Sequence, residues 1–497
     1  MEVAVGDGRH DAVAGGARGR VRLSGYVAGS LVNPKMTTNE LLALTLDIAR
    51  EYLDNLPERR VGSLASYDDL LAALGGELSD RPAEPERVIR ELSSAADPGL
   101  VGTAGPRHFG FVIGGSLPAA LAADWLTSAW DQNAFSFVLS PAATAVEEIA
   151  RRWLLDALRL SPRVTMGIVT GATMANFTSL AAARHAVLRA AGWDVEERGL
   201  FGAPEIHVLT SDESHVSIFA SLQMLGLGRS RVTRVATDDQ GRMRPDALRS
   251  SISGLSGPII VCAQAGNVNT GSFDPIAEIA PLVHAANGWL HVDGAFGVWA
   301  AASPSMRHLT NGLELADSVA VDGHKWLNVP YDCGFAFVRD ENAHRASMTL
   351  DAPYYVKSPN EVRANHNFVP EASRRARGFT VYAALRSLGK RGVGELVERC
   401  SRLASRMAER LAAHPRVRIL NDVVLDQVLV RFEPADGSDA DALTAEVIRR
   451  VQADGTCWLG GTTWHGMHVM RVSVANWSTT EADIDVSADA ILRSIPT

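Results

Sequence analysis

Residues 317–327 read DSVAVDGHKWL, a short apolar run that ends in Asp-Gly-His-Lys. Its length and β-branched residues are typical of a buried strand, so the polar residues are expected at the carboxyl end of that strand. Lys325 stands out because, of the 48 Lys and Arg residues in the chain, only four are lysines. An unpaired ammonium is costly to bury, but an amine, unlike a guanidinium, can lose its proton and attack a carbonyl. We therefore expect Lys325 to form a Schiff base with an aldehyde. The alternative is a lysine whose stem packs on apolar surface while its ammonium reaches water.

Short apolar strands alternate with helices through the middle of the chain, from about residue 163 to residue 340. The expected strands are MGIVT, IHVLT, RVTRVAT, PIIVCAQ, WLHVDG, DSVAVDG and GFAFVRD. This alternation predicts an α/β fold with a mostly parallel central sheet covered by helices on both faces. Such a sheet binds ligands at the carboxyl ends of its strands.

The chain divides into four segments by pattern. Residues 1–35 are rich in Gly and Arg and have no apolar core, so we expect a disordered extension, with Met36 as an alternative start. Residues 36–115 begin with the three-to-four spacing of amphipathic helices. Residues 116–377 are expected to form the large domain. In residues 378–497 helices and strands are separate, which predicts a smaller α+β C-terminal domain.

Composition argues against several classes of function. The formal net charge of −9 argues against general binding to the phosphates of nucleic acid. No apolar stretch reaches the roughly 18 uncharged residues of a membrane span. The four cysteines form no CxxC motif, so neither a disulfide framework nor a zinc site is expected. We therefore expect a cytoplasmic protein that binds no nucleic acid, membrane or metal.

Three other polar motifs also fall at the ends of expected strands. Ala172 and Thr173 follow Gly171 between a strand and a helix, where free backbone N–H groups can bind a phosphate. Asp293 follows the apolar strand WLHV and can pair with a protonated ring nitrogen. His215 lies just past another strand. Each motif alone has an ordinary alternative: a tight turn, a cap of the following turn, and a histidine at a helix cap.

Together these residues are the parts that pyridoxal 5′-phosphate requires: an amine for its aldehyde, an acid for its ring nitrogen, a helix terminus for its phosphate and a flat side chain against its ring. The motifs HVDGAFG, AGNVNTGSFDPI and DGHKW resemble, in order and spacing, those of the group II pyridoxal-phosphate-dependent amino-acid decarboxylases. The resemblance extends from about residue 40 to residue 490. It implies a fold-type I enzyme, similar to aspartate aminotransferase, that forms a homodimer with each active site at the subunit interface. Residues 36–115 are then expected to pack on the partner.

The resemblance implies a role for each residue at the expected site. Lys325 is similar to the lysine that binds the aldehyde, and Asp293 to the partner of the ring nitrogen. His215 resembles the histidine that stacks on the ring, with Ala295 packed beside the ring.

The phosphate end of the site resembles the family with one departure. Ala172 and Thr173 match the pair that binds the phosphate, and His324 matches the histidine that precedes the lysine. Where the family often has an asparagine in contact with the phosphate, this chain has Asp322. A carboxylate at that position should repel the phosphate.

The candidate substrate-binding residues are Arg107, His108, Phe109, Asn133 and Phe135. The first three follow a proline, where the aromatic decarboxylases have the aromatic residues of their substrate pocket. The last two lie in the motif WDQNAFSF, which the resemblance places in the partner's pocket.

The resemblance implies decarboxylation of an L-amino acid, with an aromatic or other hydrophobic side chain, to the amine and carbon dioxide. The alternatives are an aminotransferase, an oxidative aldehyde-forming relative and a homologue that binds the cofactor without catalysis. Tyr354, in the stretch DAPYY, matches the tyrosine of a DPxY-like loop motif in the family, and Tyr355 is the alternative by one position. A phenol there can deliver a proton to Cα. Aldehyde-forming relatives have phenylalanine at this position or a changed stacking histidine, and this chain has neither change.

Overall fold

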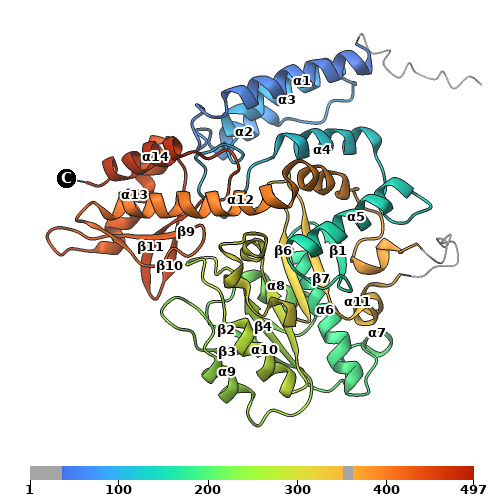
Figure 1. The fold of residues 1–497 in the computed structure, drawn as a ribbon. Coiled ribbons are helices and arrows are strands. Elements are labelled where there is room, and N and C mark those ends of the chain that lie inside the picture. The colour runs from blue at the N-terminus through green and yellow to red at the C-terminus, as the bar shows by residue number, and fades with distance from the viewer. Residues whose placement is uncertain (1–35, 351–361, 497) are drawn as a thin grey trace, which may run out of the picture. The chain divides into compact units, whose positions relative to one another are not determined.

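The computed structural model describes residues 36–350 and 362–496 (Figure 1). The expected extension at residues 1–35 lies outside the described residues. Tyr354 and Tyr355 lie outside them as well.

The described chain forms two compact units. The first comprises Ser66–Asp97 and the described residues up to Arg50. The second comprises Glu51–Ala65 and the described residues from Pro98 onward.

The first unit is helical. It holds α2 (Tyr67–Leu74), α3 (Pro85–Ala96) and most of α1 (Thr38–Asn55). Helix α2 begins with a capping box, in which the Ser66 hydroxyl accepts from the Asp69 N–H and the Asp69 carboxylate accepts from the Ser66 N–H. None of the three helices contains a buried residue, although all three carry leucines.

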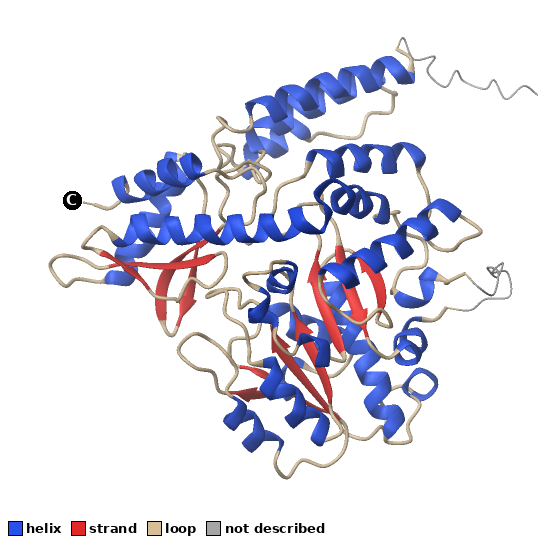
Figure 2. Cartoon of the chain, in the orientation of Figure 1, coloured by secondary structure: helices blue, strands red, loops and turns tan. Residues whose placement is uncertain are grey.

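A seven-stranded sheet forms the centre of the second unit, in the order β1-β7-β6-β5-β4-β2-β3 (Figure 2). Its strands are β1 (Thr165–Val169), β2 (His207–Ser211), β3 (Thr233–Val235), β4 (Ile259–Gln264), β5 (Trp289–Asp293), β6 (Ser318–Asp322) and β7 (Gly334–Val338). Strand β7 runs antiparallel to both of its neighbours, and the other pairs are parallel. The prediction of a mostly parallel sheet is confirmed, and each strand coincides with one of the expected apolar runs.

Helices cover both faces of this sheet because successive strand residues point to opposite sides. Val208 and Ile260 pack with residues of α6, α8 and α11 on one face. Leu209 and Val261 belong to the larger core on the other face, which includes residues of α9, α10 and α12. The helices around the sheet are α4 (Pro118–Trp130), α5 (Pro141–Ala157), α6 (Ala172–Ala190), α7 (Val195–Arg198), α8 (Val216–Met224), α9 (Pro245–Ile252), α10 (Ile276–Ala285) and α11 (Glu341–Met348).

The C-terminal part contains a second, antiparallel sheet in the order β10-β11-β9-β8. Helix α12 (Gly378–Ala412) leads into it and changes direction at Gly389, whose φ of 63° is left-handed. The other elements are β8 (Val417–Ile419), β9 (Gln427–Phe432), α13 (Ala440–Asp454), β10 (Gly460–Trp464), β11 (Met467–Ser473) and α14 (Glu481–Arg493). The predicted smaller α+β part is confirmed, whereas the segment boundaries at residues 116 and 378 stay predictions.

Within residues 36–350 and 362–496, six short 3-10 helices connect these elements. They are η1 (Asp97–Gly99), η2 (Arg229–Arg231), η3 (Gly297–Ala302), η4 (Arg307–Thr310), η5 (Leu313–Leu315) and η6 (Asn365–Phe368). Along the described parts of the chain, no helix combines the length and the apolar character needed to cross a membrane.

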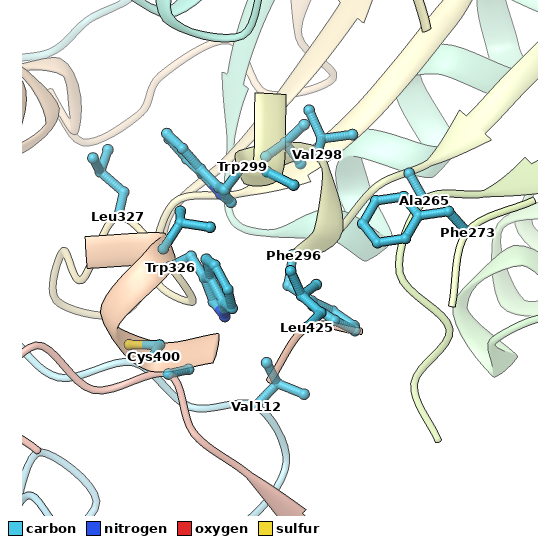
Figure 3. Close-up of a cluster of buried hydrophobic side chains, with 14 of the residues drawn as sticks. Val112, Ala265, Phe273, Phe296, Val298, Trp299, Trp326, Leu327, Cys400 and Leu425 are labelled. Atoms are coloured by element: carbon cyan, nitrogen blue, oxygen red, sulfur yellow. The ribbon is translucent and has the colours of Figure 1, made fainter. Parts of the chain in front are cut away.

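A buried apolar cluster anchors the turn that follows β6. Trp326 and Leu327, directly after Lys325, lie among Trp299, Phe296 and Cys400 (Figure 3). The backbone N–H groups of Gly323 and His324 both donate to the carbonyl of Cys333, just before β7, at 3.0 and 3.3 Å. These contacts fix the backbone on either side of Lys325.

Candidate active site

One cavity of about 440 Å³ lies at the carboxyl ends of β1, β2, β4, β5 and β6. It is lined by all eight residues that the sequence assigned to the cofactor: Ala172, Thr173, His215, Asp293, Ala295, Asp322, His324 and Lys325. They meet here because parallel strands bring their carboxyl ends to the same edge of a sheet.

The Lys325 side chain extends into this cavity from the turn after β6. Its Nζ lies 2.9 Å from Oδ2 of Asp322 and 5.9 Å from the centre of the Phe296 ring. The side chain is 18% exposed. The amine is therefore accessible from the cavity and held by one carboxylate.

Asp293 is the last residue of β5 and is buried. Its carboxylate accepts hydrogen bonds from Nδ2 of Asn176 at 3.0 Å and from the backbone N–H of Ala295 at 3.2 Å. The Ser217 hydroxyl also donates to it, at 3.4 Å. These donors fix the orientation of the carboxylate, and a carboxylate at this place can pair with a protonated ring nitrogen.

A chain of hydrogen bonds continues behind Asp293. Because Asn176 donates its amide to Asp293, its Oδ1 accepts from Nε2 of His291, at 2.9 Å. Burial lowers the pKa of His291 to about 4, so the ring is neutral and its Nδ1 accepts from the Ser318 hydroxyl, at 2.9 Å. The Ser318 oxygen in turn accepts from Nε1 of Trp289, at 2.8 Å. Sequence reasoning missed all four of these positioning residues.

His215 is the residue before α8 and presents its ring to the cavity. Its Nδ1 accepts from the backbone N–H of Ser217 at 3.2 Å and lies 2.8 Å from the Ser217 hydroxyl. Burial lowers the pKa of His215, against the opposing effect of Asp293. A neutral, flat ring fixed on one edge is suited to stacking on a cofactor ring.

The N-terminus of α6 provides an anion site. The Ala172 N–H donates to Oδ1 of Asp322 at 2.5 Å. The N–H groups of Thr173 and Met174 and the Thr173 hydroxyl have no acceptor among the described residues, and both residues line the cavity. Free donors at the positive end of a helix dipole are what a phosphate requires.

His324 and Tyr331 form the outer wall beside this anion site. Their rings stack with centres 4.1 Å apart, and Nδ1 of His324 accepts from the Cys333 N–H at 3.2 Å. Burial lowers the pKa of His324 and raises that of Tyr331 to about 12. The Tyr331 phenol is therefore protonated at neutral pH; the sequence prediction did not include it.

Arg471 reaches the cavity from the other sheet, on β11. Its Nη1 donates to the carbonyl of Val268 at 3.2 Å, and within the described residues no carboxylate lies within ion-pair distance of it. The sequence signal was an arginine between the buried residues Met470 and Val472, where a charge needs a partner.

The candidate substrate residues do not line this cavity. Arg107 donates to the carbonyl of Pro57, His108 stacks on Trp458 with ring centres 5.1 Å apart, and Phe109 is buried in the core. These three residues do not line the cavity of their own chain, whereas Phe111 and Val112 do, so the assignment of the three to the substrate pocket stays a prediction. The backbone turns here, with φ of 57° at Phe111 and 55° at Val112. Val112 is buried, whereas the Phe111 ring stacks on Trp458 with centres 5.4 Å apart and stays 65% exposed. The two residues with positive φ are themselves neither glycine nor asparagine, so the sequence does not show that they adopt this conformation.

Asn133 and Phe135 also lie away from the cavity of their own chain. Oδ1 of Asn133 accepts from the N–H groups of Phe135 and Arg374, at 3.0 and 3.2 Å. The Phe135 ring stacks on His366 with centres 4.2 Å apart. Their predicted contribution to the partner's pocket stays a prediction.

The residues of the cavity fit pyridoxal phosphate. An accessible amine, a buried carboxylate, a neutral imidazole and free donors at a helix N-terminus converge on one space. No group of three or more metal-ligating side chains occurs in the described part of the chain. The single feature against the fit is the Asp322 carboxylate at the anion site.

Comparison with known proteins gives the same result. The family model for the pyridoxal-dependent decarboxylase conserved domain matches residues 68–433. L-2,4-diaminobutyrate decarboxylase of Rhizobium meliloti (strain 1021) is 31% identical over 75% of this chain and 74% of its own length. Tryptophan decarboxylase 1 of Oryza sativa subsp. japonica is 28% identical over 78% of this chain and 80% of its own.

A solved structure shares the fold. The crystal structure of Oryza sativa TDC with PLP and tryptamine superposes with a TM-score of 0.86 at 24% identity, covering 93% of this chain and 98% of that one. The predicted fold class, cofactor and reaction class are therefore confirmed. The chain belongs to the pyridoxal-dependent decarboxylase family and is a fold-type I carboxy-lyase that uses pyridoxal phosphate.

Proposed function

We propose that the protein decarboxylates an L-amino acid with an aromatic or other hydrophobic side chain. The observation that carries this substrate class is the wall of the cavity, where Phe111, Val112 and Phe296 provide apolar surface. The carboxylates on the described wall are Asp293 and Asp322, and both already have partners. A cationic side chain, such as that of diaminobutyrate, would find no free carboxylate there.

Arg471 is suited to bind the carboxylate of the incoming amino acid. Of the two strong cations on the described wall, Lys325 pairs with Asp322, whereas Arg471 faces the cavity without an ion pair. A guanidinium presents two donors to a carboxylate and so fixes its orientation. Orientation matters here because the bond between Cα and the carboxylate carbon must be perpendicular to the plane of the cofactor ring in order to break.

The other residues of the site are proposed to bind the cofactor or to hold and deliver protons. When bound, pyridoxal phosphate supplies an aldehyde that condenses with amines and a ring that accepts the electrons left on Cα when carbon dioxide departs. Lys325 would bind the aldehyde, and Asp293 would hold a proton on the ring nitrogen. His215 would stack on the ring, and Thr173 and Met174 would donate to the phosphate. Tyr354, by the family resemblance, delivers the proton to Cα that completes the amine.

A homodimer is the proposed assembly. Leu42 on α1, Leu71 on α2 and Leu92 on α3 are each more than half exposed, at 58%, 51% and 54%. Leucine-bearing helices without a single buried residue form an apolar surface that favours association. The occupant we propose is the same segment of a second copy, in line with the interface role expected of residues 36–115. Asn133 and Phe135 would then contribute to the partner's site.

The cytoplasm is the proposed location. The four cysteines are all buried and unpaired, as is typical of a reducing compartment.

The experiment that tests the reaction is incubation of the holoenzyme with pooled L-amino acids that include 2,4-diaminobutyrate, followed by mass detection of products. We expect the amine of an aromatic or other hydrophobic amino acid, and no product from a Lys325→Ala variant. Keto acids would indicate an aminotransferase, and aldehyde with peroxide an oxidative relative. Diaminopropane would contradict the substrate class, and no product from any amino acid would indicate a homologue that only binds the cofactor.

A further inference from the structure

Asp322 lies where the family often has an asparagine, and its carboxylate is built into the anion site. It is 2% exposed. Oδ1 accepts from the first N–H of α6, at Ala172, and lies 3.4 Å from Nε2 of His324. Oδ2 lies 2.9 Å from Nζ of Lys325. The carboxylate thus occupies a donor of the helix terminus that the cofactor phosphate needs and pairs with the amine that the cofactor aldehyde needs.

The phosphate of the cofactor has to bind at the same helix terminus. The donors left for it are the N–H groups of Thr173 and Met174 and the Thr173 hydroxyl, one and two residues along from the amide that Asp322 occupies. A phosphate carries about −1.5 to −2 charges at neutral pH. Two anions this close repel each other strongly in a buried site, where the effective dielectric constant is low.

We propose that Asp322 competes with the phosphate and lowers the affinity of the protein for pyridoxal phosphate. The carboxylate accepts from the Ala172 amide and pairs with Lys325. In the loaded protein the same carboxylate faces the phosphate. An asparagine at this position would keep the size of the side chain and remove the repulsion. The inference rests on the family's cofactor and not on the proposed substrate, because no substrate enters its test.

The test compares cofactor binding by the wild type, Asp322→Asn and Asp322→Ser, each freed of cofactor and refilled. Equilibrium dialysis gives the dissociation constants of pyridoxal phosphate and of pyridoxal, which has the aldehyde and ring but no phosphate. We expect both variants to bind pyridoxal phosphate about tenfold more tightly than the wild type. Removing a like charge this close removes a repulsion equivalent to at least about one pKa unit, which is a factor of ten in a dissociation constant. Pyridoxal binding should change by less than about twofold.

Asp246→Asn is the matched control, because it changes the net charge equally at an exposed carboxylate paired with Arg244. It should leave both constants unchanged. Unchanged or weaker binding of pyridoxal phosphate by the two Asp322 variants would overturn the proposal. An equal gain for pyridoxal would also overturn it, because the effect would then act through Lys325 and not through the phosphate.

Discussion

At the scale of single residues, this site depends on how each charge is partnered. Asp293 has three donors and Asp322 has a helix N–H and an ammonium, whereas Arg471 has only neutral acceptors. We propose that the groups with charged partners hold the cofactor or compete with it, and that the guanidinium of Arg471, which has no ion pair among the described residues, binds the substrate.

The first prediction at this scale concerns Asn176, which donates to Asp293. Asn176→Ala removes a hydrogen bond to a charged group, worth about 1.5–3 kcal/mol, so we expect kcat to fall about 10- to 100-fold. The protonation of the cofactor ring, followed by absorbance against pH, should shift to higher pH, because a carboxylate that has lost a donor attracts the ring proton more strongly.

Asn421→Ala is the control for this prediction, because Asn421 is also a buried, triply bonded asparagine but lies at the second sheet. It should leave the absorbance titration unchanged. A normal titration in Asn176→Ala would contradict the positioning role of Asn176.

A second prediction concerns Tyr354, which the sequence alone assigns to proton delivery. Tyr354→Phe retains the ring and removes the hydroxyl, so amine release should slow and part of the turnover should yield aldehyde, ammonia and peroxide. The measurement is the ratio of amine to aldehyde by mass detection, together with oxygen consumption. An unchanged amine yield would contradict this role, and the same test on Tyr355→Phe shows which of the two tyrosines acts.

At the scale of elements, the residues that follow strands could be predicted from the sequence and the others could not. A buried strand is an apolar run, so a polar residue at its end, such as Asp293 or Lys325, is conspicuous. Asn176 lies within α6, where a polar residue is ordinary on the side that faces water. Arg471 belongs to a different sheet, and no local pattern shows that the two sheets meet at one cavity.

His344 links three elements and gives a prediction at this scale. Its Nε2 donates to the Phe368 carbonyl in η6 at 3.0 Å, and its Nδ1 accepts from the Thr165 hydroxyl in β1 at 2.7 Å. Burial lowers the pKa of His344 to about 3, from 6.5. The folded state therefore excludes a proton that the unfolded chain binds, so the stability that neutral His344 contributes is present above pH 6.5 and is lost as the pH falls toward 3.

The substitution His344→Gln tests this linkage. At pH 7 the variant should be less stable by about 1–3 kcal/mol, because buried partners lose their hydrogen bonds. That difference should shrink as the pH is lowered, since glutamine does not titrate and all other groups are shared. Urea unfolding at several pH values measures it, and a difference that stays constant down to pH 4 would contradict the assignment.

At the scale of the whole molecule, the prediction concerns association through the leucines of the first unit. Leu42→Glu combined with Leu71→Glu places charges on the surface that we assign to the partner, so sedimentation should show monomers where the wild type shows dimers. Activity should be lost when the dimer dissociates, because each site is proposed to contain residues from both subunits. Phe201→Glu is the control, at an apolar residue of the second unit that is 98% exposed. Dimers in the double variant, or a fully active wild-type monomer, would contradict the assembly.

The hydrogen bonds behind Asp293 all run in one direction. Trp289, Ser318, His291 and Asn176 each point a hydrogen toward the carboxylate, so their dipoles add and act as an extended positive pole. An indole and an amide begin and end this row, and neither gives up a proton at physiological pH. The row therefore cannot relay protons. It directs the positive ends of its dipoles toward the carboxylate, but it provides no path along which a proton could reach or leave the ring nitrogen.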